Sequence, residues 1–505
     1  MCAGTRRRVK GVLTMALAGW TSIACAREFS VMAYNVENLF DIDGVSVYED
    51  YGPDKYGAAH LAVKLSNIAR VLRESGPEAP AVLVLNEIEL DQTPEPGFDR
   101  TKWIEEAAGR RYDEWLAEGS ELPPSLRDAP VDAWLVKALE DEGLGRYSVA
   151  ETDEKPGVYE GGRPIGVRNL VLSKLPIRDV RTYPTPDARA LLEVVLDIDG
   201  SPLVVFANHW KSGAGSDSSE KIRVENARVL RKRLDELLAG DPQMDIIIAG
   251  DLNSHYNQGS RYRYMKETGI GNVLGSQGNE LAIRGRGRDL YNLWFELPSD
   301  QRGSDTYQNE WGTLMHILLT RGLYDRRGVQ YVDNSFRVLS LQGINADSFG
   351  RPVRWQAQGK GYSDHFPLVA RFRTAPEGDA GSWMPLIEPH GDGKTSGEAR
   401  PVDFNRVDIL RTALDAGALP ADVDLQDGSH DGRFFRVSAP ATLDKRGVVR
   451  VELRGQTFEV YTFDRRLRET IREKVKKSGS LQFYGELGTH RGRYQFLVHG
   501  KEWLG

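Results

Sequence analysis

Short apolar runs rich in Val, Ile and Leu recur along most of the chain, separated by polar and glycine-bearing segments. Runs of this length and composition are typical of strands buried within a sheet. Several of them end in an acid, an amide or a histidine, as in "AVLVLNEI" and "PLVVFANHW". We predict strands at residues 29–36, 81–88, 167–177, 189–200, 202–210, 245–254, 312–320 and 366–372.

Two segments have helical periodicity instead. Leu61, Leu65, Ile68 and Leu72 recur on one face of a helix within residues 57–75, and residues 218–240 form a longer amphipathic helix. Residues 91–142 are polar and contain Pro and Trp, so we expect an insertion with two helices. Many strands with few helices between them predict that residues 27–374 form a two-sheet α/β sandwich flanked by helices.

The last part of the chain predicts a separate small domain. Residues 375–401 are rich in Gly and Pro and are typical of a linker. Residues 402–505 then contain strands, one helix within 464–479, and further strands. This order suits a five-stranded oligonucleotide-binding (OB) barrel.

The first 26 residues differ from the rest in composition. A basic start "TRRRVK", an apolar middle and "ACA" before Arg27 are typical of a secretory signal peptide, so we expect a secreted or periplasmic protein. A lipid anchor at Cys25 is the disfavoured alternative. Both cysteines lie in this leader, so a metal site in the remainder needs oxygen and nitrogen ligands.

Charge is distributed unevenly along the 505 residues. Removing the four basic residues of the leader takes the formal net charge from −7 to −11, which argues against simple coating of nucleic acid. Residues 432–505 nevertheless hold 16 Lys or Arg against 8 Asp or Glu. These basic residues alternate with Phe and Tyr, a composition suited to base stacking and phosphate contact, although the aromatics equally suit a barrel core.

Polar side chains gather at the strand ends. Eight of them are candidates for one site: Asn35, Glu37, Glu87, His209, Asp251, Asn253, Asp364 and His365. Carboxylate and amide oxygens suit a hard divalent ion such as Mg²⁺, with Mn²⁺ or Ca²⁺ as alternatives. Histidine moves protons near neutral pH or stabilises phosphoryl charge, and Lys211 is placed to contact phosphate. This set fits phosphodiester hydrolysis.

The segments "NVENLFD", "LNEIE", "NHWKS", "GDLNS" and "SDHFPL" resemble, in this order, motifs of the endonuclease/exonuclease/phosphatase superfamily of Mg²⁺-dependent DNase-like enzymes. The resemblance implies a two-sheet sandwich with its site at one end of the sheets. It also implies roles: metal ligation by Asn35, Glu37, Glu87 and Asp364; transition-state stabilisation by His209 and Asn253; positioning of the attacking water by Asp251; acid/base work by His365; and phosphate contact by Arg168.

One position departs from the superfamily pattern. Met315 stands where relatives usually have an aspartate that orients the histidine corresponding to His365. Methionine can only pack there. Either another acid replaces the aspartate, with Glu310 as a distant candidate, or catalysis is impaired.

The sequence therefore predicts an exported, metal-dependent nuclease acting on DNA or RNA, with a nucleic-acid-binding barrel. A phosphatase or phosphodiesterase for lipid or sugar phosphates is the first alternative, because the same constellation serves those substrates. A non-catalytic nucleic-acid-binding protein, which Met315 would permit, is the second.

Overall fold

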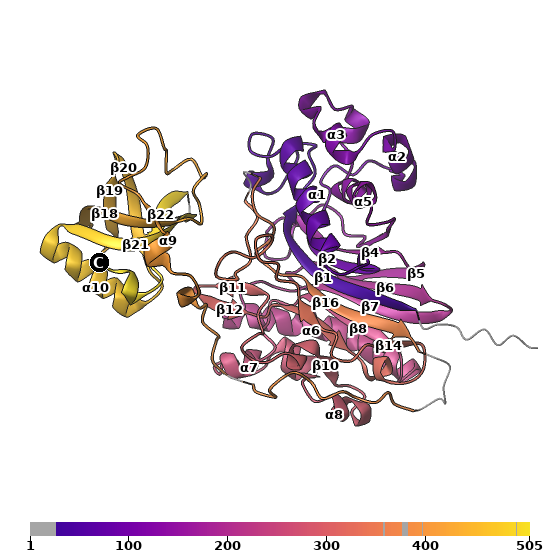
Figure 1. The fold of residues 1–505 in the computed structure, drawn as a ribbon. Helices are drawn as coiled ribbons and strands as arrows, with labels where there is room; N and C mark the ends of the chain where they lie inside the picture. Colours follow the sequence, from indigo (N-terminus) through magenta and orange to yellow (C-terminus); the bar gives the residue numbers. More distant parts are fainter. Residues whose placement is uncertain (1–26, 357–358, 376–381, 396, 491) are drawn as a thin grey trace, which may run out of the picture.

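The computed structural model describes residues 27–356, 359–375, 382–395, 397–490 and 492–505. The predicted signal peptide lies outside the described residues. Two seven-stranded sheets pack face to face, and a small barrel stands beside them (Figure 1). The predicted two-sheet sandwich is confirmed.

The first sheet has the order β14-β16-β1-β2-β4-β3, with β15 also paired to β16. The second has the order β5-β6-β7-β8-β13-β10-β9. The strands of the first sheet are β1 (Glu28–Leu39), β2 (Val82–Glu89), β3 (Ser148–Glu151), β4 (Val167–Ser173), β14 (Val329–Tyr331), β15 (Arg337–Val338) and β16 (Leu368–Thr374). Those of the second are β5 (Ile177–Tyr183), β6 (Leu191–Ile198), β7 (Ser201–His209), β8 (Ile246–Asp251), β9 (Ser276–Gln277), β10 (Leu290–Asn292) and β13 (Met315–Leu319).

Helices cover the outer faces of both sheets. Along β1, Val31 and Ala33 face the core between the sheets, whereas Met32 and Tyr34 face the helical layer, so both faces of the strand are buried. This double burial is why the strand is an unbroken apolar run. The helices of the sandwich are α1 (Ala58–Arg73), α2 (Arg100–Ala107), α3 (Tyr112–Leu116), α4 (Pro124–Arg127), α5 (Val131–Asp141), α6 (Asp217–Gly240), α7 (Gln258–Arg261) and α8 (Glu280–Gly285).

Two local predictions need correction. The run expected to be one strand over 167–177 is two strands, because the chain leaves β4 after Ser173 and enters the other sheet as β5 at Ile177, with Pro176 at the crossing. The insertion holds the four helices α2 to α5 instead of two. Short helices of this kind are stabilised by packing on the sheet more than by their own periodicity.

The C-terminal barrel is closed by five strands in the order β18-β19-β20-β22-β21, with β21 pairing back to β18. Its elements are β18 (Phe434–Leu443), β19 (Val449–Leu453), β20 (Gln456–Tyr461), α10 (Arg465–Ser478), β21 (Ser480–His490) and β22 (Arg493–Leu497), preceded by α9 (Ile409–Thr412) and β17 (Leu414–Asp415). The parallel β20–β22 pair and the helix between β20 and β21 give the predicted OB-like arrangement.

Four of the aromatics counted for base stacking are core residues. Phe435, Phe458, Phe483 and Phe496 are fully buried inside the barrel, so they cannot stack on bases. Tyr461 remains partly exposed, with Arg468 over its ring. The structure thus reduces the aromatic part of the predicted binding surface.

The barrel is joined to the sandwich by a buried polar contact. Arg351 donates two hydrogen bonds to the Glu486 carboxylate, at 3.0 and 2.8 Å. His499 lies 2.6 Å from Glu486 and 2.9 Å from Asn309, which connects the two strands of the hairpin β11 (Asp305–Tyr307) and β12 (Glu310–Gly312). Phe349 packs against Phe434 beside this contact.

Candidate active site at the strand ends

The ends of β1, β2, β7 and β8, with the loop before β16, bring the predicted side chains together. Asn35 Nδ2 donates to Glu87 Oε1 at 3.0 Å and to Asp251 Oδ2 at 3.1 Å. His209 Nε2 and His365 Nε2 each lie 3.7 Å from Asp251 Oδ2. Residues separated by up to 330 positions thus converge on one carboxylate.

Backbone irregularities aim these side chains. The β1–β2 register shifts after Asn35, the β2–β4 register shifts after Leu85, and Glu37 and Glu87 have φ of 52° and 63°. Non-glycine residues with positive φ cluster at functional sites, and bulges redirect side chains at strand ends. Gly250 serves the same end, because a Cβ there would lie 2.2 Å from the Asn208 carbonyl oxygen and push β7 away from β8.

A buried amide network beneath the site was not expected from the sequence. Asn86 bridges the two sheets: its amide donates to Asn169 Oδ1 and to the Asn208 carbonyl, and its Oδ1 accepts from the Asp251 backbone N–H. Asp251 is held further by the Asn253 N–H, which donates to Oδ1 at 2.8 Å. The only sequence signal was an amide inside the apolar run "LVLNE".

Burial and neighbouring charges set the protonation of the site. Burial raises the pKa of Asp251 to about 6, with His365 and the Asn253 N–H opposing it. Burial, together with Arg189 and His365, holds the pKa of His209 well below its ordinary value. For His365, burial is outweighed by the carboxylates of Asp364, Asp251 and Asp305, which raise the pKa to about 9. A neutral imidazole and an imidazolium therefore flank Asp251.

Glu37 lies next to the site, but its carboxylate is engaged. Arg354 donates to Oε1 at 2.7 and 2.9 Å, and the Trp355 N–H donates to Oε2 at 2.6 Å. The backbone carbonyl of Glu37 accepts from buried Lys64. Its role as an auxiliary metal ligand stays a prediction. Arg354 also approaches Asp364 at 3.4 Å, so this arginine, missed in the sequence, is the cation nearest the predicted metal ligands Glu37 and Asp364.

The two predicted phosphate-binding residues lie differently. Lys211 lies 3.9 Å from Asp187 and close enough to Arg163 and Arg189 for their charges to act on it, in a basic group beside His209. Arg168 is held in a buried ion-pair cluster, with Asp132 at 3.0 Å and Glu151 at 2.7 Å. That pairing occupies two of its guanidinium nitrogens, and its phosphate contact stays a prediction.

The position of the expected orienting aspartate is filled by apolar packing. Met315 lies directly opposite Asp251 in the β8–β13 register and is fully buried. Glu310, the suggested replacement, is instead half-exposed and paired with Arg261 at 3.0 Å. Besides Asp364 and Asp251, the fold brings a third acid to His365: Asp305, at the start of β11.

Asp305 and His365 form an isolated antiparallel bridge, which places their side chains next to each other on one face. Asp305 is buried, and its Oδ1 accepts from the Leu314 N–H and the Ser304 hydroxyl. His365 Nδ1 has no partner among the described residues. Asp305 was not found in the sequence because it lies in a short polar loop segment, "GSDTY", with no motif around it.

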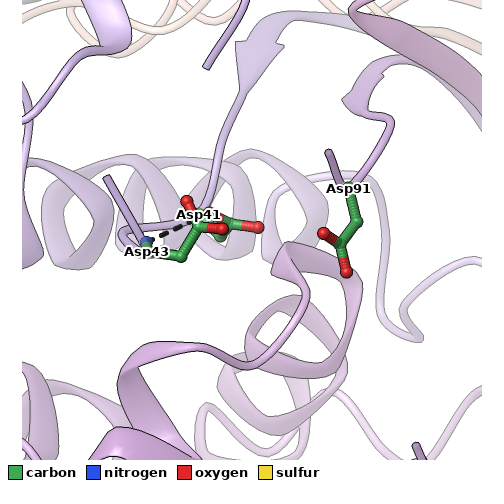
Figure 2. Close-up of side chains that lie close together, drawn as sticks. All are labelled: Asp41, Asp43 and Asp91. Carbon is green, nitrogen blue, oxygen red and sulfur yellow. Dashed lines mark hydrogen bonds between the residues drawn. The ribbon is translucent and has the colours of Figure 1, made fainter. Parts of the chain in front are cut away.

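A separate acidic cluster follows β1 and β2. Figure 2 shows Asp41 and Asp43 joined by a hydrogen bond, with Asp91 across from them. Their oxygens accept from the chain's own groups: the Asp43 N–H to Asp41, the Val45 N–H to Asp43, and the Thr93 N–H to Asp91. These turn-type contacts account for the cluster without a ligand.

Comparison with known proteins finds one family model that matches part of the chain. Residues 173–374 match the family model described as "Endonuclease/Exonuclease/phosphatase family". Over residues 173–374 the chain is similar to the endonuclease/exonuclease/phosphatase superfamily, whose members are hydrolytic phosphoesterases and are generally dependent on divalent metal ions.

Several solved structures are similar to this chain at low identity. Truncated TDP2 from Caenorhabditis elegans is 15% identical, over 68% of this chain and 97% of its own, with a TM-score of 0.37. The human Nocturnin catalytic domain is 14% identical, over 69% and 94%, with a TM-score of 0.36. D. rerio TDP2 complexed with a single-strand DNA product is 14% identical, over 68% and 98%, with a TM-score of 0.35. Among curated proteins, none is significantly similar in sequence.

Proposed function

We propose that this protein is an exported, metal-dependent phosphodiesterase that cleaves nucleic acid, DNA in preference to RNA, by direct attack of water on phosphorus. The observation that carries the proposal is the convergence of Asn35, Glu87, His209 and His365 around the buried carboxylate of Asp251.

The donor set fits a hard divalent cation. Glu87 supplies carboxylate oxygens, of which only Oε1 is hydrogen-bonded among the described residues. Asn35 Oδ1 accepts one hydrogen bond, from the Glu37 N–H, and keeps a second lone pair for a cation. Glu87 is also partly exposed, which leaves the site open to a ligand. Oxygen ligands of this kind suit Mg²⁺. When bound, the cation would neutralise phosphate charge and stabilise the leaving oxygen.

The residues of the chain divide the remaining work. Asp251, ionised above a pKa of about 6, accepts a hydrogen bond from the attacking water and orients it. His365, which stays charged up to a pKa of about 9, donates to a phosphoryl oxygen on which negative charge develops. His209 and Asn253 border the same carboxylate and supply further hydrogen bonds to the phosphoryl group.

Asp305 is the positioning residue of this mechanism. It lies opposite His365, where its negative charge stabilises the imidazolium. In relatives this stabilisation comes from the aspartate at the position that Met315 occupies here. The negative charge of Asp305 opposite His365 favours an enzyme over a non-catalytic binding protein, because it stabilises the charged histidine, which Met315 cannot do.

A polymeric substrate is favoured by the attached barrel. Residues 432–505 have a net charge of +8, and Lys476 and Lys477 lie exposed on α10. A tethered binding module raises the local concentration of a polymer at the site. Among the described residues, no helix combines the length and apolar character that a bilayer span requires.

The test is cleavage by the full chain of single-stranded DNA, duplex DNA, RNA, a lipid phosphodiester and a sugar phosphate, with Mg²⁺ and with EDTA. We expect Mg²⁺-dependent cleavage of DNA, lost in Glu87→Gln and Asp251→Asn. Faster turnover of the lipid or sugar substrate would replace the nuclease assignment with the phosphoesterase alternative. Retention of DNA without cleavage at any Mg²⁺ or Mn²⁺ concentration would leave only a binding function.

A further inference from the structure

A second group of buried acids lies outside the active site. Glu280 at the start of α8, Glu296 at the end of the 3-10 helix η4 (Leu293–Glu296), and Asp333 after β14 form what we call the acidic triad. One carboxylate oxygen from each lies within 4.8 Å of the other two. Glu280 and Glu296 are 7% and 1% exposed.

The triad lacks the charge compensation that buried acids need. Tyr324 donates to Glu280 Oε1 at 3.1 Å, Tyr331 donates to Glu296 Oε2 at 2.6 Å, and the Ile387 N–H donates to Asp333 Oδ2 at 2.5 Å. No Lys, Arg or His forms an ion pair with any of the three in the described part of the chain. Burying carboxylates together is costly unless a proton or a cation neutralises them.

The basic side chain whose charge acts on Glu280 is directed elsewhere. The charge of Arg284 acts on Glu280, but its guanidinium donates to the Met384 carbonyl and lies over the Trp383 ring. Consistent with missing compensation, burial and the Asp333 charge raise the pKa of Glu280 to about 8, and burial raises that of Glu296 well above its ordinary value.

Two oxygens of the triad accept no hydrogen bond from an N–H group or a hydroxyl. Glu296 Oε1 and Asp333 Oδ1 are both buried and receive no such bond from the described residues, although Asp333 lies within hydrogen-bonding reach of the Glu280 carboxyl group. In each carboxylate the other oxygen accepts a hydrogen bond, from Tyr331 for Glu296 and from Ile387 for Asp333, and this bond fixes the orientation of the group. The aspartate cluster of Figure 2 differs in this respect, because its oxygens accept from local N–H groups.

We propose that the acidic triad binds one hard divalent cation of the Ca²⁺ class, which ties α8, η4 and the loop after β14 together. The donors are all oxygens, as such a cation prefers, and Ca²⁺ tolerates the irregular geometry that three separate elements provide. The site is structural and does not depend on the proposed nuclease activity.

The experiment separates this site from the active site. In Glu87→Gln, which weakens the predicted active-site metal, thermal unfolding is followed with CaCl₂ alone and with MgCl₂ alone. We expect the Tm to rise by roughly 3–6 °C at about 100 times the Kd of Ca²⁺. Equilibrium dialysis should find one more Ca²⁺ in Glu87→Gln than in Glu87→Gln with Glu296→Gln.

Removing one acid of the triad should change the Tm in opposite directions without and with Ca²⁺. Without Ca²⁺, Glu296→Gln should unfold at a higher Tm than the unchanged chain, because one uncompensated acid is gone; with Ca²⁺ the order should reverse. Glu388→Gln, an exposed acid next to Ile387, is the matched control and should keep the full Ca²⁺ response. Asp333→Asn, at a less buried position, replaces Glu296→Gln if that variant fails to fold. A Tm unaffected by Ca²⁺ in Glu87→Gln, or a Ca²⁺-induced rise in the triad variant equal to that of the chain with an intact triad, overturns the proposal.

Discussion

Asp305→Asn tests whether the fold has replaced the missing aspartate of the superfamily. The asparagine keeps the size of the side chain and the Oδ1 acceptor, so the contacts from Leu314 and Ser304 can persist. What is lost is one negative charge opposite His365. We therefore expect a change in turnover with little change in folding.

The magnitude follows from the charge that is removed. An opposite charge within about 4–6 Å stabilises an imidazolium by about 1–3 pKa units, or about 1.4–4 kcal/mol. Asp305 is the third of the carboxylates that raise the pKa of His365 to about 9, after Asp364 and Asp251, so the lower end applies. We predict a fall in kcat of roughly tenfold, with KM nearly unchanged, because the interaction acts mainly in the transition state.

The assay is steady-state cleavage of a fluorogenic oligonucleotide in Mg²⁺ by the full chain. Glu310→Gln is the matched control: it removes one negative charge from the same hairpin, but from a half-exposed acid paired with Arg261, and kcat should not change. Met315→Asp introduced into Asp305→Asn should recover part of the loss, because residue 315 lies beside Asp251. An Asp305→Asn enzyme with the turnover of the unchanged chain would refute the positioning role.

Three further outcomes are expected. Glu486→Gln should weaken the contact between the barrel and the sandwich. Arg351 and His499 outweigh burial and lower the pKa of Glu486 to about 2 from the ordinary 4.5, which corresponds to about 3 kcal/mol of stability. This contribution is present above about pH 4.5 and is lost as the pH falls towards 2, which urea unfolding at a series of pH values will measure. Lys476→Ala with Lys477→Ala should raise KM for long DNA but not for a dinucleotide, and flatten the salt dependence of binding. The pH profile of kcat should rise through about 6 with Asp251 and fall through about 9 with His365; a flat profile between pH 5 and 10 would contradict both assignments.

Much of the fold followed from local pattern. The run "AVLVLNEI" predicted a strand over 81–88 and β2 covers Val82–Glu89, while the period of Leu61, Leu65 and Leu72 predicted α1. Prediction was wrong where packing decided the outcome. The chain changes sheets between β4 and β5, although "VRNLVLSKLPI" reads as one apolar run.

Some residues of the candidate site were also predicted from the sequence, and others were found only in the structure. Asn35, Glu87, His209, Asp251 and His365 were identified because each follows or precedes a recognisable strand within a motif. Asp305, Arg354 and Asn86 carry no such signal. Their contacts join β11 to the loop before β16, the 354–355 loop to β1, and one sheet to the other.

The amino-acid sequence by itself determined which segments are strands and helices, and which residue types stand at their ends, because side-chain periodicity and turn chemistry act over a few neighbouring positions. Only the tertiary structure decided which acid faces His365, which phenylalanines fill the barrel, and that Glu280, Glu296 and Asp333 meet in one buried place. Electrostatic and packing energies depend on distance in space, and separation along the chain does not encode that distance.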